Sequence, residues 1–75
     1  MKHLRHLAVF AVVVENDSFA AAAKKLGTSR SRVSETVAGL EESLGVRLLN
    51  RSTRQLTLTS DGKRVYQHAA QLQQI

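Results

Sequence analysis

Arginines are placed in this sequence where they could bind an anion. Arg30 and Arg32 stand at the start of a predicted helix, and Arg51 and Arg54 lie in a predicted hairpin that follows it. A guanidinium group offers several N–H donors in one plane, which suit phosphate oxygens and the O6 and N7 atoms of guanine. Arginine in a first helical turn is unfavourable for the helix dipole, which favours a binding role for Arg30. The two groups predict a polyanionic partner, and a helix presented by its amino end favours double-stranded DNA.

The composition agrees with a nucleic-acid partner and excludes several other classes of protein. The 75 residues carry a net charge of +5, and 43% of them are hydrophobic, which predicts one small folded domain. The sequence has no cysteine, so disulfides and thiolate metal sites are excluded. The longest apolar run, Leu7 to Val14, is far shorter than the roughly 20 residues of a membrane span, and we predict a cytoplasmic protein.

No residues form a pattern typical of catalysis or of a metal site. The sequence shows no nucleophile–base pair, no phosphate-cradling glycine loop and no pair of catalytic carboxylates, so an enzyme is not expected. His3 and His6 are three residues apart but have no third ligand nearby, which favours a solvated pair. We therefore predict no metal.

Local signals divide the amino-terminal part of the chain into three helices. Apolar residues at helical spacing predict a helix over about 4–16, although the β-branched run inside it would also suit a buried strand. Ser18 is the expected N-cap of a second helix, which ends at Gly27. Ser29 is the expected N-cap of a third helix, over about 29–44.

The third helix is predicted to bury one face and to expose the opposite one. The expected buried stripe is Val33, Val37, Leu40 and Leu44. The residues expected to point away from the core are Ser31, Glu35 and Ala38, with Arg30 and Ser34 at the exposed end. Gly45 then stops the helix, because glycine adopts the left-handed conformation of a helix end without strain.

A hairpin and a last helix complete the predicted elements. Residues 48–51 and 55–58 read as two short strands joined by a bend at 52–54. Thr59 is the expected cap of a last helix, which carries an apolar stripe of Val65, Ala69 and Leu72. We expect this stripe to contact a second subunit. The helix has no stop signal, which is typical of a longer helix cut short.

Most of the chain resembles the N-terminal domain of LysR-type transcriptional regulators. The segment that carries the resemblance reads SFAAAAKKLGTSRSRVSETVAGLEESLGVRLLNRSTRQLTLTSDG. Its matching positions include Ser18-Phe19, Ala22-Ala23, Leu26, Ser29, Val33-Ser34, Val37, Leu40-Glu41, Leu44 to Leu49, Arg51, Leu58-Thr59 and Gly62, together with Phe10 before the segment. So many positions make the resemblance far more specific than a helix-turn-helix pattern alone.

The resemblance implies a mainly α fold and a modular protein. Residues 1–58 would form a winged helix-turn-helix DNA-binding domain, with a three-helix core plus a two-stranded β wing. Residues 59–75 would be the truncated start of a linker (dimerisation) helix. The family forms homodimers through this helix, often tetramers at full length, and binds inverted-repeat operators at the bacterial nucleoid. A small-molecule effector would bind a C-terminal domain outside this fragment, and no cofactor is expected within it.

Candidate roles follow from the resemblance together with helix geometry. Base readout in the major groove is assigned to Arg30, Ser31, Ser34 and Glu35. Contacts to the DNA backbone are assigned to Ser18, Thr28, Ser29, Arg32, Arg51, Ser52 and Thr53. The minor-groove contact from the wing is assigned to Arg54, and the dimerisation contacts to Val65, Ala69 and Leu72. Ser18, Thr28 and Ser29 are helix caps first, and a phosphate contact is compatible with that role.

Three positions depart from the pattern of the family, and they leave alternatives open. Position 30 is commonly Gln, position 32 small and position 35 basic, but this chain has Arg30, Arg32 and Glu35. Its base preference should therefore differ from that of a typical member. Glu35 could accept a hydrogen bond from cytosine N4 or pair with Arg32. The alternative function is a winged-helix protein-interaction module, whose binding would depend less on salt than DNA binding does.

Overall fold

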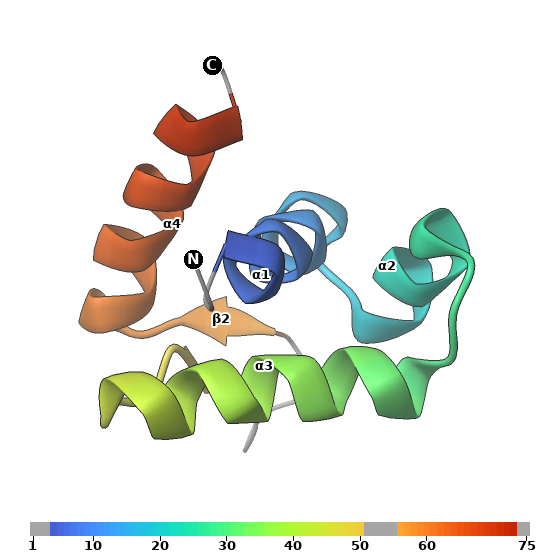
Figure 1. The fold of residues 1–75 in the computed structure, drawn as a ribbon, viewed down its shortest axis with the longest axis horizontal. Helices are drawn as coiled ribbons and strands as arrows, with labels where there is room; N and C mark the ends of the chain where they lie inside the picture. Colours follow the sequence, from blue (N-terminus) through green and yellow to red (C-terminus); the bar gives the residue numbers. More distant parts are fainter. Residues whose placement is uncertain (1–3, 51–55, 74–75) are drawn as a thin grey trace.

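The computed structural model describes residues 4–50 and 56–73, and for Leu72 and Gln73 it describes the backbone alone. The elements, in chain order, are α1 (Leu4–Asn16), α2 (Phe19–Leu26), α3 (Arg30–Leu44), β1 (Leu49–Asn50), β2 (Thr57–Leu58) and α4 (Ser60–Gln73). Figure 1 shows α1 nearly end-on above α3, with α2 on one side of it and α4 on the other. The fold is a three-helix core with a two-stranded wing and a fourth helix, as the sequence predicted.

The ends of α2 and α3 are set by local capping. The Ser18 hydroxyl accepts a hydrogen bond from Ala21 N, and the Ser29 hydroxyl accepts one from Arg32 N, each at 3.1 Å. Gly27 and Gly45 close the two helices in the left-handed conformation, with φ of 69° and 71°. The predicted caps and stops are therefore confirmed.

The core is formed where α1, α2 and α3 meet the base of the wing. Its fully buried large side chains are Phe10, Val13, Val33, Val37, Leu40 and Leu48. Ala22 and Ala23 are also buried, and their small side chains allow α2 to approach its neighbours closely. The β-branched run of α1 is part of the helix and does not form a buried strand. Packing of α1 against α2, α3 and α4 favours the helix here.

Two leucines, one at the end of α3 and one at the start of α1, are partly exposed. Leu44 is 42% exposed and Leu4 is 48% exposed. In the last turns of α3 the buried place is taken by Glu41, which is 8% exposed, because its carboxylate bonds to backbone amides of the following segment. Helical spacing identified the buried face of α3 but gave no sign that a charged residue would occupy it.

The wing is a minimal antiparallel pair joined closely to α4. Leu49 pairs with Leu58 and Asn50 pairs with Thr57. Thr59 N donates to Leu48 O at 3.0 Å, and the Thr59 hydroxyl accepts from Gly62 N at 2.9 Å, which confirms the predicted cap of α4. The first turn of α4 therefore lies directly against Leu48, the residue immediately before β1.

The apolar stripe of α4 packs against its own domain rather than standing free. Ala69 is 1% exposed, and Val65 is half-buried against the core. In this conformation Ala69 is covered by its own domain, where α4 packs on α1. The dimerisation contacts stay a prediction. The side chain of Leu72 lies outside the described residues.

A polar contact adds to the packing of α4 on α1. The Tyr66 hydroxyl donates to Glu15 Oε2 at 3.3 Å. Burial raises the pKa of Tyr66, and the charge of Glu15 and the hydrogen bond to it raise it further. Tyr66 therefore keeps its proton, and the hydrogen bond that it donates, to higher pH than an ordinary tyrosine.

Gly62→Ala should strongly destabilise the domain. A methyl group at this position would overlap the backbone carbonyl oxygen of Leu48 and lie 3.1 Å from Leu58 Cδ2. Because backbone atoms cannot move aside cheaply, we expect a loss of about 3 kcal/mol in the free energy of unfolding, or roughly 10 °C or more in Tm. Thermal unfolding followed by circular dichroism measures the change.

The matched control is Gly39→Ala, within α3. No atom lies within 4 Å of a methyl group built there, and alanine favours the helix by about 0.5–1 kcal/mol over glycine. This variant should therefore gain stability. An equal effect of the two substitutions would show that the close approach at Gly62 is unimportant.

Candidate nucleic-acid interface

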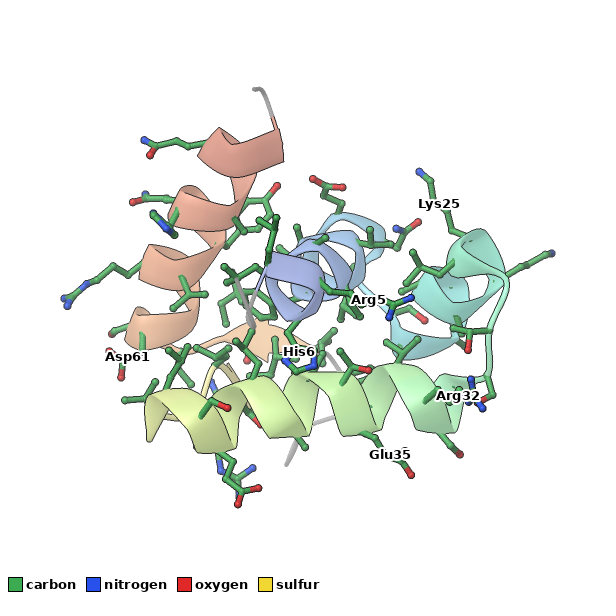
Figure 2. The ribbon with its side chains drawn as sticks, viewed as in Figure 1. Arg5, His6, Lys25, Arg32, Glu35 and Asp61 are labelled. Atoms are coloured by element: carbon green, nitrogen blue, oxygen red, sulfur yellow. The ribbon has the colours of Figure 1, made fainter. Side chains whose placement is uncertain are left out.

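The amino-terminal end of α3 presents one continuous polar face. Arg30, Ser31 and Glu35 are exposed and Ser34 is half-buried. These four side chains line a shallow surface hollow of about 430 Å³. Figure 2 shows Glu35 directed away from the core, on the side of α3 opposite to α1. The structure thus brings together all four residues predicted for base readout.

The turn between α2 and α3 lies at the surface, next to the start of α3. Thr28 and Ser29 are both exposed, and the Ser29 hydroxyl is used as the cap of the helix. Ser18 lies at the opposite end of α2, where its hydroxyl caps that helix. A phosphate contact at Ser18 or Ser29 would therefore come mainly from backbone N–H groups.

Positive charge gathers around the same turn. Lys24, Lys25, Arg30 and Arg32 are all exposed, and Figure 2 shows Lys25 and Arg32 at this end of the molecule. Glu35 is the acidic residue of the face. Among the described residues, no group of three or more His, Asp or Glu side chains could hold a metal ion. The positive charges of this surface suit an anionic partner, and the hydroxyl and carboxylate groups beside them can form further hydrogen bonds.

The predicted wing residues cannot be placed on this surface. Arg51, Ser52, Thr53 and Arg54 lie outside the described residues. The described part of the wing is its base, where Asn50 Nδ2 donates to Thr57 Oγ1 at 3.3 Å across the two strands. The structure does show how this base is attached to α3.

Glu41 attaches the wing to α3. Its Oε2 atom accepts hydrogen bonds from Leu48 N at 2.8 Å and from Leu49 N at 3.3 Å. Its backbone carbonyl accepts from Gly45 N at 2.8 Å and from Val46 N at 3.2 Å. In the sequence Glu41 was identified only as one of the positions that match the family pattern, and this role was not predicted. A signal was present, since Glu41 follows the buried Val37 by four residues and so shares its side of the helix.

The comparisons with known proteins agree with this geometry. The sequence model of the bacterial regulatory helix-turn-helix proteins of the lysR family matches residues 4–63. The chain belongs to the LysR family. It is a winged helix-turn-helix DNA-binding domain of a LysR-type regulator, which confirms the resemblance found in the sequence.

Individual LysR relatives are similar over nearly all of the chain. The HTH-type transcriptional activator AaeR of Escherichia coli (strain K12) is 52% identical over 67 residues, which cover 89% of this chain and 22% of AaeR. The HTH-type transcriptional regulator CrgA of Neisseria meningitidis serogroup C is 50% identical over 68 residues, which cover 91% of this chain and 23% of CrgA. The chain thus spans about a fifth of the length of these relatives.

A solved LysR structure has nearly the same fold. The crystal structure of the BenM DNA-binding domain with catB site 1 DNA is similar with a TM-score of 0.91 and 42% sequence identity. The match covers 95% of this chain and 79% of that one. In the described part of this LysR domain, no helix has the length and apolar character needed to cross a membrane.

Removing the carboxylate of Glu41 should loosen the wing. Glu41→Ala leaves the buried amides of Leu48 and Leu49 without this acceptor, which we expect to cost about 3 kcal/mol of unfolding free energy. Hydrogen exchange should show faster exchange at these two amides. Glu42→Ala is the matched control, because Glu42 is the exposed neighbour. Unchanged protection of both amides in Glu41→Ala would contradict the role of the carboxylate.

Proposed function

We propose that this LysR domain binds double-stranded DNA sequence-specifically through the amino-terminal part of its third helix. The recognition helix, about 29–44, would lie in the major groove, and the wing, about 48–58, on the adjacent backbone or minor groove. The observation that carries the proposal is the exposed face at the start of α3, formed by Arg30, Ser31, Ser34 and Glu35. It is polar, lies at a helix end and contributes no large side chain to the core.

Each residue of this face suits a different base-edge contact. Arg30 would donate two hydrogen bonds to guanine O6 and N7, a pairing that discriminates by about 1–3 kcal/mol. Glu35 would accept from cytosine N4, and the hydroxyls of Ser31 and Ser34 can donate or accept. The arginine and the glutamate together would favour a G·C-containing half-site.

Positioning contacts would surround the reading face. Exposed Arg32 and the backbone at the start of α3, beside Thr28 and Ser29, would bind phosphates, and Ser18 would do so at the start of α2. Arg51, Ser52 and Thr53 are proposed backbone contacts, and Arg54 a minor-groove contact, on the strength of their match to the family pattern. These contacts carry affinity but little sequence information.

The relatives support a regulatory role for the longer protein. BenM is named in a complex with catB site 1 DNA, and AaeR is named a transcriptional activator. By this relationship we propose a cytoplasmic transcriptional regulator without enzymatic activity. Its effector would bind a further domain, and it would act as a homodimer or tetramer on an inverted repeat. Half-sites would be about 34 Å apart, one turn of DNA, or a multiple of it.

The rival function, a protein-interaction module, has lost part of its support. An apolar face on α4 that such a module could use includes Val65 and Ala69, and both are packed within the domain. The exposed surface at the start of α3 is instead polar and positively charged. DNA binding is therefore the better explanation of what the domain exposes.

Arg30→Ala and Arg51→Ala should affect DNA binding differently. Arg30→Ala should flatten the preference among sites, because it removes a base contact worth about 1–3 kcal/mol. Arg51→Ala should weaken all sites alike and lower the slope of log K against log salt by about one, because it removes a phosphate contact. Selection of bound duplexes from a random pool, repeated at two salt concentrations, measures both effects. The same sequence-independent loss in both variants would contradict the division into reading and anchoring residues.

Leu72→Glu should abolish dimerisation if α4 joins two subunits. Because Ala69 is buried within the domain and Val65 partly so, Leu72 is the predicted residue on which this proposal now depends. A charge at an apolar subunit contact is strongly unfavourable. Sedimentation of the variant against the parent chain gives the association state. Gln71→Glu, at an exposed neighbour, is the control, and an unchanged association state in Leu72→Glu would reject the contact.

A further inference from the structure

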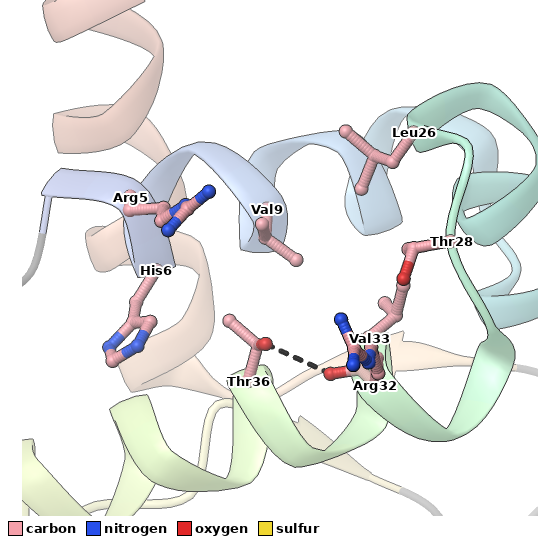
Figure 3. A pocket seen from close by; sticks show the side chains of 8 residues that line it. All are labelled: Arg5, His6, Val9, Leu26, Thr28, Arg32, Val33 and Thr36. Atoms are coloured by element: carbon pink, nitrogen blue, oxygen red, sulfur yellow. Dashed lines mark hydrogen bonds between the residues drawn. The ribbon is translucent and has the colours of Figure 1, made fainter.

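A groove opens between the amino end of α1 and the start of α3. It has a volume of about 400 Å³. Arg5 and His6 line it from α1, Thr28 and Arg32 line it from the other side, and Val9 and Val33 lie between them. Figure 3 shows the guanidinium groups of Arg5 and Arg32 on opposite sides of the opening. Residues from separate helices are thus brought to one site that sequence spacing did not indicate.

The charge of the groove is of one sign. Arg5, Arg32 and Thr28 are exposed, and no residue lining the groove is acidic. Within residues 4–50 and 56–73, neither arginine forms an ion pair. Two unpaired guanidinium groups facing one opening repel each other, and an anion between them would relieve that repulsion. The apolar side chains between them limit competition from water, which strengthens charge-assisted hydrogen bonds.

The groove lies on a defined flank of α3. Arg32 and Thr36 are four residues apart and share this flank, where the Thr36 hydroxyl donates to Arg32 O at 2.9 Å. Ser34 and Glu41, seven residues apart, share the other flank, and Glu41 contacts the base of the wing. The groove and the wing are therefore on opposite sides of the proposed reading face.

The dimensions of DNA indicate where its two strands would lie relative to α3. A major groove is about 12 Å wide, and a helix with its side chains is about 10–12 Å across. A helix lying in the groove therefore has a sugar–phosphate strand close to each flank. The wing would meet one strand, which leaves the other strand beside Arg32 and the groove.

We propose that Arg5, together with Arg32 and Thr28, binds a backbone phosphate of the DNA strand on the flank opposite the wing. This rests on the proposed binding of α3 in the major groove, and it adds α1 to the DNA-contacting surface. Arg5 acts as a positioning residue that fixes how α3 is seated. The contact adds affinity at every site and does not distinguish one base from another.

Arg5→Ala in the 75-residue chain tests the proposal. The probe is a duplex carrying the site selected from the random pool. We expect binding about tenfold weaker at 0.1 M salt, a salt slope lower by about one, and unchanged discrimination between selected and mismatched duplexes. Arg5→Lys should retain the slope, because it keeps a cation there. Arg64→Ala is the matched control, since it removes the same charge from an exposed position on α4.

A second measurement locates the phosphate. In a set of duplexes, each carries one uncharged methylphosphonate at a different position along either strand. At one position the substitution should weaken binding of the parent chain but should not weaken binding of Arg5→Ala any further. That position should lie on the strand facing away from the wing. An Arg5→Ala slope equal to that of Arg64→Ala, or additive losses at every methylphosphonate, would overturn the proposal.

These experiments distinguish failure of the Arg5 contact from failure of the proposed DNA binding by α3. If the parent chain prefers its selected duplex while Arg5→Ala matches Arg64→Ala, the phosphate contact is wrong and DNA reading by α3 stands. If the parent chain shows no preference among duplexes, the proposed function itself is wrong. In that case the contact from Arg5 is rejected with it.

Discussion

The hydrogen bonds from two backbone amides to the Glu41 carboxylate hold the wing against α3. Strands of two residues each have little stability of their own, so the hairpin depends on what holds its base. Glu41 fixes that base from the side of α3, and the contacts of Thr59 and Gly62 fix it from the side of α4. The position of any wing residue relative to the face of α3 therefore depends on these few backbone contacts. A buried charge is tolerated here because backbone amides satisfy it.

The helices were predictable from sequence because their limits are decided locally. Ser18, Ser29, Gly27 and Gly45 act on neighbours within one turn, so the residue types alone located the ends of α2 and α3. Burial was less predictable, because it depends on which element covers each face. Leu44 had the right spacing but little cover, whereas Ala69 is buried on α4, a helix that packs on the distant α1. The hairpin was predicted in position, and its attachment through a glutamate was not.

The residues of the candidate site also differ in how well they could be predicted from the sequence. The face of Arg30, Ser31, Ser34 and Glu35 lies within one short stretch of one helix, so its exposure followed from the apolar stripe on the opposite side. The groove of Arg5 and Arg32 joins α1 to α3, and nothing in the spacing of either residue connects them. Residues of one helix can be assigned to a face from sequence, but a site between helices requires the packing that brings them together.

The separation of binding residues from packing residues explains how such a domain could change its specificity. Arg30, Ser31 and Glu35 are exposed and bury no core side chain, so replacing them would change the proposed reading face at little cost to folding. Glu41 and Gly62 are confined by backbone atoms, so they admit few alternatives. This small domain has limited stability, and a change in its supports would cost more than a change in its reading face. The positively charged flank formed by Arg5 and Arg32 beside that face would keep the helix seated whichever bases it selects, because phosphates are present at every sequence.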